Sequence, residues 1–154
     1  MDDDRVKEFE TALWIGGEDV YRRSIDPQCL MIVPAPPFLL GGSQAVEAVS
    51  RTPRWESVDF EYFSIGRPQE GLIVLAYSVR ASRGGEAYNA HCTSTYRRVA
   101  HEQWLVVQHH QSLRPIVASA GERPGHVDDE DAAGGMERAQ KDAAEERESD
   151  RGYQ

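Results

Sequence analysis

The stretch at residues 88–112, YNAHCTSTYRRVAHEQWLVVQHHQS, constrains the fold of this chain most strongly. Residues 88–98 are rich in Thr, Tyr and Cys, and residues 104–111 carry Trp, Val and Leu. These residue types suit the pleated, half-buried surface of a β-strand. The connection at residues 99–102 contains no Asn-Gly or Asp-Gly pair, so we expect a looser loop than a tight hairpin turn. The stretch therefore predicts a long two-stranded hairpin that must bury one face.

The segments before this hairpin supply helices that could cover it. Residues 2–15 predict a helix, because acidic residues begin it and one apolar stripe follows at helical spacing, formed by Val6, Phe9 and Leu13. A short helix is expected over residues 18–24 and ends before Asp26-Pro27, because a residue that precedes proline avoids helical geometry. A third helix is predicted over residues 44–50, with Ser43 as its cap.

The remaining segments predict strands and one unusual loop. The apolar run CLMIV at residues 29–33 predicts a first strand, and residues 55–65 and 72–81 predict two more before the hairpin. Residues 34–42, PAPPFLLGG, are too rich in proline and glycine for regular structure. Because this loop is also apolar, we expect it to fold over the open end of the core or over a ligand pocket.

Charge and composition divide the chain in two. Apolar runs are frequent up to about residue 117 and almost absent afterwards, so we expect one folded domain over residues 1–117 and a mostly disordered acidic tail over residues 118–154. The formal net charge is −9, and from residue 122 onward eleven acidic residues face five basic ones. This balance argues against nucleic-acid binding, which needs clustered Lys and Arg.

The cysteines and the N-terminus indicate a reducing compartment. Cys29 and Cys92 each lie in a predicted strand, without CxxC or zinc-site spacing, and are expected to be buried free thiols. The N-terminus is acidic where a signal peptide is basic, and no apolar run approaches membrane-spanning length. We therefore expect a cytoplasmic protein that does not bind membranes.

Four sequence pieces carry a resemblance to a known family. They are LWIGGEDVY at residues 13–21, the end of the first strand with Gly41-Gly42 before a helix, AHCTSTYRR at residues 90–98, and WLVVQHHQS at residues 104–112. Over residues 6–114 the chain resembles the nuclear-transport-factor-2-like superfamily, in particular a bacterial group of unknown function close to SnoaL-like polyketide cyclases and ketosteroid isomerases. The resemblance implies an α+β fold in which a curved antiparallel sheet wraps around N-terminal helices as a cone with an internal cavity. It also implies a small-molecule ligand in that cavity, a homodimer and no cofactor.

The register of the hairpin decides which side chains face the cavity, because a shift of one residue exchanges the two faces. The larger apolar area lies on one face, which we expect to point toward the helices; its members are Tyr88, Cys92, Ser94, Tyr96, Trp104, Val106, Gln108 and His110. The resemblance places the opposite face, which carries Thr and His residues, at the dimer interface. The alternative register turns His109 inward instead of His110.

Histidines and tyrosines are the candidate functional residues. His109 and His110 are adjacent on one strand and point in opposite directions, and no acid stands near them, so we expect no metal site. Either histidine is a candidate for proton transfer, because the histidine pKa lies near neutrality, although a structural role is also open. The predicted ligand-binding residues are Tyr77, Tyr88, Tyr96, Gln108 and His110.

A cavity carboxylate is the other expected feature of an enzyme with this fold. Asp59 and Glu61 alternate with Val58, Phe60 and Tyr62, which we expect to face inward, so the two acids are expected at the surface. Without a clear inward acid, the sequence favours a non-catalytic ligand-binding domain. Two alternatives stay open: a cofactor-free isomerase, cyclase or dehydratase, and a dimerisation domain with a filled cavity.

Overall fold

The computed structural model describes residues 1–114, which form one compact unit. The elements follow in the order α1 (Asp3–Ile15), α2 (Glu18–Ser24), β1 (Ile25–Ile32), β2 (Leu39–Gly41), α3 (Gly42–Arg51), β3 (Ser57–Gln69), β4 (Leu72–Arg83), β5 (Glu86–Ala100) and β6 (Gln103–Leu113). This order confirms the predicted sequence of helices and strands and adds the short strand β2. The domain boundary predicted at residue 117 and the tail predicted over residues 118–154 lie outside the described residues and stay predictions.

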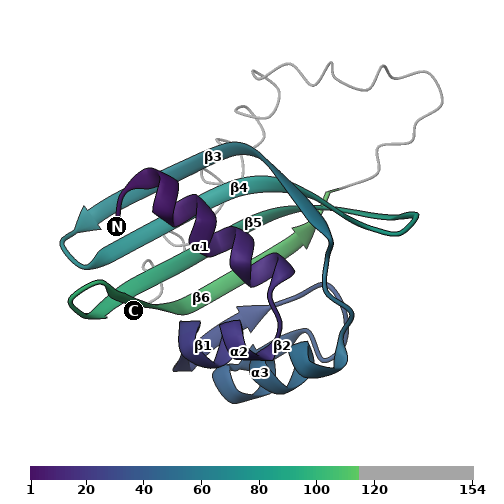
Figure 1. Ribbon diagram of the computed structural model, residues 1–154, viewed down its shortest axis with the longest axis horizontal. Coiled ribbons are helices and arrows are strands. Elements are labelled where there is room, and N and C mark those ends of the chain that lie inside the picture. Colours follow the sequence, from purple (N-terminus) through teal and green to yellow (C-terminus); the bar gives the residue numbers. More distant parts are fainter. Residues whose placement is uncertain (115–154) are drawn as a thin grey trace, which may run out of the picture. The chain divides into compact units, whose positions relative to one another are not determined.

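All six strands form one curved, open sheet in the order β2-β1-β6-β5-β4-β3. Neighbouring strands are antiparallel except for β1 and β6, which pair in parallel. Figure 1 shows α1 lying across one face of the long strands, with α2 and α3 beside β1 and β2. The predicted α+β fold, a curved sheet around N-terminal helices, is confirmed.

Helix α1 follows the predicted pattern closely. Asp2 is its N-cap, and its carboxylate accepts a hydrogen bond from the backbone N–H of Arg5 at 2.9 Å. Val6, Leu13 and Trp14 are buried against the sheet. The apolar stripe therefore fixes which side of α1 faces the inside of the fold.

The apolar loop after β1 ends as an edge strand. Strand β2 pairs with β1, and this pairing buries Leu40. Ser43 is not the cap of α3, contrary to the prediction; Gly41 is the N-cap, and its backbone N–H donates to the side-chain oxygen of Gln44 at 2.8 Å. The cap moves because β2 continues up to Gly41, which leaves Ser43 inside the first turn of the helix.

Gly42 allows α3 to approach β1. A Cβ atom on this residue would lie 2.4 Å from the backbone oxygen of Asp26, which cannot move aside as a side chain could. We expect Gly42→Ala to lower the free energy of unfolding by about 2 kcal/mol, as overpacking commonly does. Chemical denaturation measures the change. Gly41→Ala is the matched control, since its Cβ would meet nothing closer than 3.5 Å; an equal loss in both variants would contradict the steric explanation.

Asp26 was predicted to end α2 in a turn, but it lies within β1 and is 3% exposed. Its carboxylate accepts hydrogen bonds from the backbone N–H of Gln28 at 2.8 Å and from the Arg97 guanidinium at 2.7 Å. The Gln28 N–H and then Arg97 lower the pKa of Asp26, against the opposing effect of burial. Asp26 therefore joins β1 to β5, the strand on the far side of β6.

Both cysteines are buried free thiols, as predicted. Burial raises the pKa of Cys29 and of Cys92 to about 12. Because the thiolate is the reactive form, neither residue is suited to nucleophilic chemistry.

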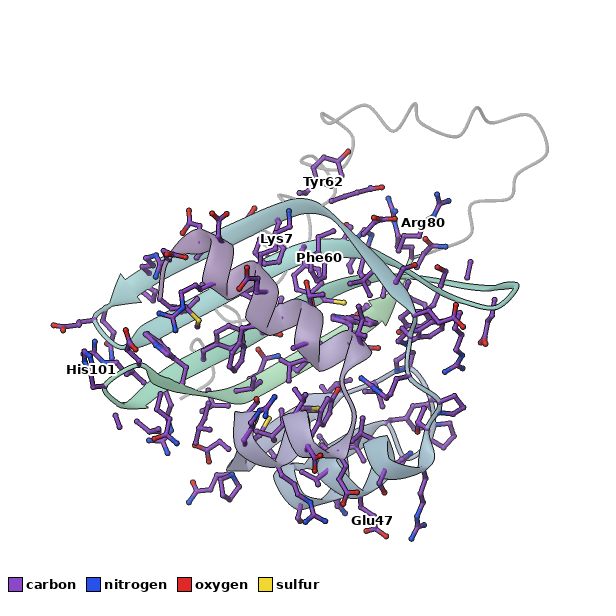
Figure 2. All side chains as sticks on the ribbon, viewed as in Figure 1. Lys7, Glu47, Phe60, Tyr62, Arg80 and His101 are labelled. Atoms are coloured by element: carbon purple, nitrogen blue, oxygen red, sulfur yellow. The ribbon has the colours of Figure 1, made fainter. Side chains whose placement is uncertain are left out.

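Two register shifts change which side chains face inward. In β6 the partner of Thr95 is Gln108 and that of Tyr96 is Val106, so Val107 is an extra, unpaired residue. A second shift in β3, between Glu61 and Ser64, leaves Tyr62 80% exposed, and Figure 2 shows its side chain pointing away from the sheet. The prediction that Tyr62 faces inward is therefore wrong, because Tyr62 lies within the bulge with a φ of 56° and Phe63 packs against the core instead.

The turn between β5 and β6 is tighter than predicted. Ala100 pairs with Gln103, so only His101 and Glu102 connect the two strands. Glu102 adopts a φ of 56°, the left-handed conformation that Asn and Gly usually provide in such turns. The sequence therefore misleads here, because the turn forms without its preferred residues.

Candidate functional site

A buried carboxylate occupies the centre of the fold. Glu10 lies on α1, one helical turn after Val6 and one before Trp14, and its exposure is 0%. It accepts hydrogen bonds from the hydroxyls of Tyr77 at 2.5 Å, of Ser94 at 2.7 Å and of Tyr96. Oε1 accepts from Tyr77 and Ser94 and Oε2 accepts from Tyr96, so both buried oxygens of the carboxyl group have a donor.

Additional groups extend this network on both sides. The indole N–H of Trp14 donates to the Tyr77 hydroxyl at 2.9 Å. On the other side, Ser94 Oγ lies 2.7 Å from Nδ1 of His109, which is 8% exposed. Helix α1 and strands β4, β5 and β6 therefore meet at one polar cluster inside an otherwise apolar core.

The hydrogen bonds around His109 fit one arrangement of protons. The Ser94 hydroxyl gives its only proton to Glu10, so His109 Nδ1 must carry the proton that it donates to Ser94. The other ring nitrogen, Nε2, lies 3.0 Å from Nε2 of Gln111, whose side-chain oxygen accepts from the Tyr88 hydroxyl at 2.7 Å. Gln111 therefore donates to His109, and the imidazole is neutral, with its Nε2 lone pair accepting the hydrogen bond from Gln111.

The electrostatic surroundings favour the same protonation states. Burial lowers the pKa of His109 below its ordinary value, and this effect outweighs the opposing attraction of Glu10. Burial, and next the charge of Glu10, raise the pKa values of Tyr77 and Tyr96 well above normal. At neutral pH the site thus contains a neutral histidine and two protonated tyrosines around one carboxylate.

His109 and Gln111 form part of the wall of two cavities. The larger, of about 240 Å³, lies between the inner face of the sheet, α2, α3 and the proline-rich loop. The smaller, of about 50 Å³, extends toward α1 and Trp14. Both cavities share six wall residues: Tyr21, Met31, Arg54, Trp55, His109 and Gln111. They are therefore neighbouring parts of one hollow region, and His109 and Gln111 line both parts.

The walls of the larger cavity are mainly apolar. Val33, Ala35, Pro36, Pro37, Leu40, Ala45, Ala48 and Val49 line it in addition to the shared residues. The proline-rich loop is thus part of the pocket wall, which was one of its two expected roles. A mainly apolar wall with a few polar groups is the usual composition of a small-molecule site.

The structure separates the predicted site residues into two groups. Tyr77 and Tyr96 bond to Glu10, and Tyr88 orients Gln111. Gln108 and His110, predicted to face the cavity, instead lie on the outer face, where Gln108 bonds to Thr93 and His110 pairs with Thr93. That part of the predicted face is wrong because the bulge at Val107 exchanges the faces of all later residues in β6.

Glu10 is the central residue that the sequence analysis missed. The apolar stripe of α1 was traced through Val6 and Leu13, and Glu10 lies between them at helical spacing. An acid inside an apolar stripe is therefore the sequence feature that could have revealed it. Asp59 and Glu61 are exposed, as expected.

Comparison with known protein structures identifies the fold of this chain. No protein-family model and no curated protein matches this sequence. A Parabacteroides distasonis protein described as a candidate ketosteroid isomerase superposes with a TM-score of 0.63 at 18% identity, over 72% of this chain and 86% of its own. An NTF2-like protein of unknown function in nutrient uptake from Rhodospirillum rubrum gives a TM-score of 0.61 at 15% identity, over 75% and 100%. The chain has the nuclear-transport-factor-2-like fold.

A third structure with this fold serves a different purpose. The association domain of Caenorhabditis elegans CaMKII has a TM-score of 0.55 at 17% identity, over 71% of this chain and 90% of its own. The NTF2-like fold therefore occurs both in candidate enzymes and in an association domain, and the site must decide between such roles.

Two further features concern the described residues alone. Within residues 1–114, His, Cys, Asp and Glu side chains form no group of three that could hold a metal ion. No helix in the same part of the chain is long and apolar enough to cross a membrane.

Proposed function

We propose that this domain binds a small molecule in the cavity between the inner face of the sheet, α2, α3 and the proline-rich loop. The observation that supports this function is the mainly apolar cavity of about 240 Å³ whose wall also includes His109, Gln111 and Arg54. The alternative of a dimerisation domain with a filled cavity fits less well, because two cavities are present. The cytoplasmic location expected from the sequence stays a prediction.

Met31 provides a direct test of ligand binding. The chain contains three methionines, and Met31 lines both cavities, so its ¹³C-labelled methyl group reports on their contents by NMR. We expect compounds from a library of small acids, amides and alcohols to shift the Met31 signal and to leave Met1 unchanged. Ala48→Phe fills the larger cavity and abolishes these shifts. Ala76→Phe, on the exposed outer face of the sheet, is the matched control; equal responses in both variants would contradict the proposed cavity.

A second function, proton transfer, is favoured by the orientation of the hydrogen bonds. His109 and Gln111 both line the cavity, and the His109 Nε2 lone pair accepts a hydrogen bond from Gln111. The proton on Nδ1 is directed through Ser94 to Glu10. When a substrate displaces the Gln111 amide and gives a proton to Nε2, the Glu10 carboxylate, 3.6 Å from Nδ1, stabilises the imidazolium that forms. This arrangement supports the alternative function, that of a cofactor-free isomerase, cyclase or dehydratase.

Deuterium exchange tests this second function. In D₂O the protein should catalyse hydrogen exchange at the carbon next to the carbonyl of β,γ-unsaturated ketones, and His109→Gln should remove the activity. Because burial lowers the pKa of His109, the basic form is already present at neutral pH. The rate is therefore expected to stay level above about pH 6.5 and to fall at lower pH. Exchange that is equally fast with His109→Gln would eliminate His109 as the base.

The outer face of the sheet supports the predicted homodimer. Leu30, Ile32 and Leu39 are 45–60% exposed there, next to Gln108 and His110 of β6. We propose that a second copy of the chain covers these three apolar residues of β1 and β2. They adjoin the sheet face with the Thr and His residues, which is where the dimer interface is expected. Light scattering should give twice the monomer mass, and Leu30→Glu should give the monomer. A wild-type protein that is monomeric at high concentration would contradict the proposal.

A further inference from the structure

Arg54 is held at the cavity by neutral groups. Its Nε donates to the backbone oxygen of Gly16 at 2.7 Å, and its Nη2 donates to the backbone oxygen of Leu13 at 2.5 Å and to the Tyr21 hydroxyl at 3.4 Å. Its guanidinium carbon also lies 5.2 Å from the centre of the Tyr21 ring. These contacts fix the position of the guanidinium without neutralising its charge.

No anion of the described chain balances this charge. Among residues 1–114, no carboxylate lies within ion-pair distance of Arg54. Neither cavity is lined by Asp or Glu, and the only other basic side chain in their walls, His109, is neutral. The hollow region therefore has one net positive charge in its wall.

Two N–H groups of the Arg54 guanidinium remain available for hydrogen bonds. Arginine has five N–H groups, of which Arg54 uses one at Nε and two at Nη2. Nη1 has no hydrogen-bond partner within residues 1–114, and it is not sealed from solvent, because this part of the chain contains no buried unsatisfied side-chain atom. A role in capping the C-terminal end of α1 explains the bonds that Arg54 makes but leaves its two remaining N–H groups without a function.

We propose that the cavity binds a small monocarboxylic acid with an apolar body, whose carboxylate pairs with Arg54. This inference rests on the proposed ligand-binding function and specifies the class of ligand. A planar guanidinium matches a carboxylate through charge-assisted hydrogen bonds, which are stronger than those between neutral groups. The single positive charge favours one carboxylate over two.

The remaining walls define the rest of the ligand. Met31, Leu40, Val49 and the two prolines supply apolar surface. The Trp55 ring adds an aromatic wall and is itself held between Tyr88, whose ring centre lies 5.4 Å away, and the Arg83 guanidinium carbon at 4.4 Å. A volume of about 240 Å³ is below that of pockets for drug-sized ligands, so the body is expected to be about the size of one phenyl ring with a short chain.

Three matched compounds test the inference on the unmodified full-length chain. The probes are 3-phenylpropionate, 3-phenylpropionamide and 3-phenylpropan-1-ol, which share one body and differ in the polar end. Calorimetry gives the affinities, and the Met31 methyl signal gives the location. We expect the carboxylate to bind about ten- to hundredfold more tightly than the amide or the alcohol, the usual range for a charge-assisted pair. Its affinity is also expected to fall as salt is added.

Two arginine variants complete the test. Arg54→Gln should remove the preference for the carboxylate, while Arg54→Lys should keep part of it and show that the fold survives a change at this position. Arg80→Gln makes the same change in net charge at an exposed residue, which Figure 2 shows far from α3, and should leave the preference unchanged.

The possible results separate this inference from the function on which it rests. A carboxylate preference that disappears in Arg54→Gln alone supports the inference. Equal affinity for the three compounds, with the Met31 signal shifted, overturns the carboxylate assignment but leaves the ligand-binding function intact. No shift of Met31 with any of the three compounds, or with the wider library, overturns both.

Discussion

Replacing Glu10 with glutamine should lower the free energy of unfolding by about 3 kcal/mol, because a carboxylate that accepts three buried hydrogen bonds becomes an amide with one acceptor. Tyr77 and Ser94 both donate to Oε1, and Tyr96 donates to Oε2. Glutamine must direct its NH₂ group toward at least one of these hydroxyls, whose own protons already point inward. One donor is then left without a partner in a site that water does not reach.

Urea denaturation measures this loss, and the chain supplies a matched control. Glu8 lies on the exposed side of the same helix, so Glu8→Gln should change the stability by less than about 0.5 kcal/mol. A double-mutant cycle with Tyr96→Phe should show coupling. Tyr96→Phe removes a hydroxyl donor that has already lost its acceptor in Glu10→Gln. Two fully additive losses, or an unchanged stability in Glu10→Gln, would show that the native carboxylate is not the common acceptor described above.

Asp26→Asn should produce the second large effect, a loss of about 2 kcal/mol at pH 7, which is typical of a hydrogen bond to a charged group. Asparagine can still accept from the Gln28 N–H but cannot pair with Arg97. The loss is expected to be smaller than for a fully buried ion pair, because the Arg97 side chain is 54% exposed and water can solvate it. Glu47→Gln, which breaks the exposed pair with Arg51, should cost no more than about 0.5 kcal/mol.

The stability difference between the wild type and Asp26→Asn should depend on pH in a defined direction. Asp26 has a lowered pKa in the folded protein, so the unfolded chain binds the proton more readily than the folded chain. The ionised carboxylate therefore stabilises the fold above about pH 4, and this stabilisation is lost as the pH falls through the lowered pKa. The difference between the wild type and Asp26→Asn should be constant near neutrality and shrink in acid. A difference that is independent of pH would contradict a role for the Asp26 charge.

Much of the fold could be predicted because neighbouring residues determine it. The apolar stripe of α1, the proline and glycine run after β1, and the Thr- and Val-rich strands each depend on spacing within a few residues. The resemblance over residues 6–114 then indicated how these elements assemble, and the superposed structures confirm that fold. The inward face of β5 was also predicted correctly, since Cys92, Ser94 and Tyr96 alternate along an unbroken strand.

The site depended on two tertiary features that spacing does not reveal. One is the bulge at Val107, which turns His109 and Gln111 toward the cavity and places Gln108 and His110 outside. The strand pairs before and after Val107 fix where the extra residue lies. Valine is common throughout β-strands, so the residue type at position 107 does not indicate a bulge. The cavity face of β6 therefore changes halfway along a strand whose sequence shows a regular alternation.

The other feature is Glu10. Local spacing is enough to predict the apolar stripe of α1 and to place Tyr77, Ser94 and Tyr96 on strands. The convergence of these three hydroxyls on one helical carboxylate becomes visible in the folded chain, because they come from two strands more than sixty residues after Glu10. The physical reason is that a buried charge is tolerated only where several donors meet it, and such a meeting depends on the packing of α1 against the sheet rather than on any local pattern.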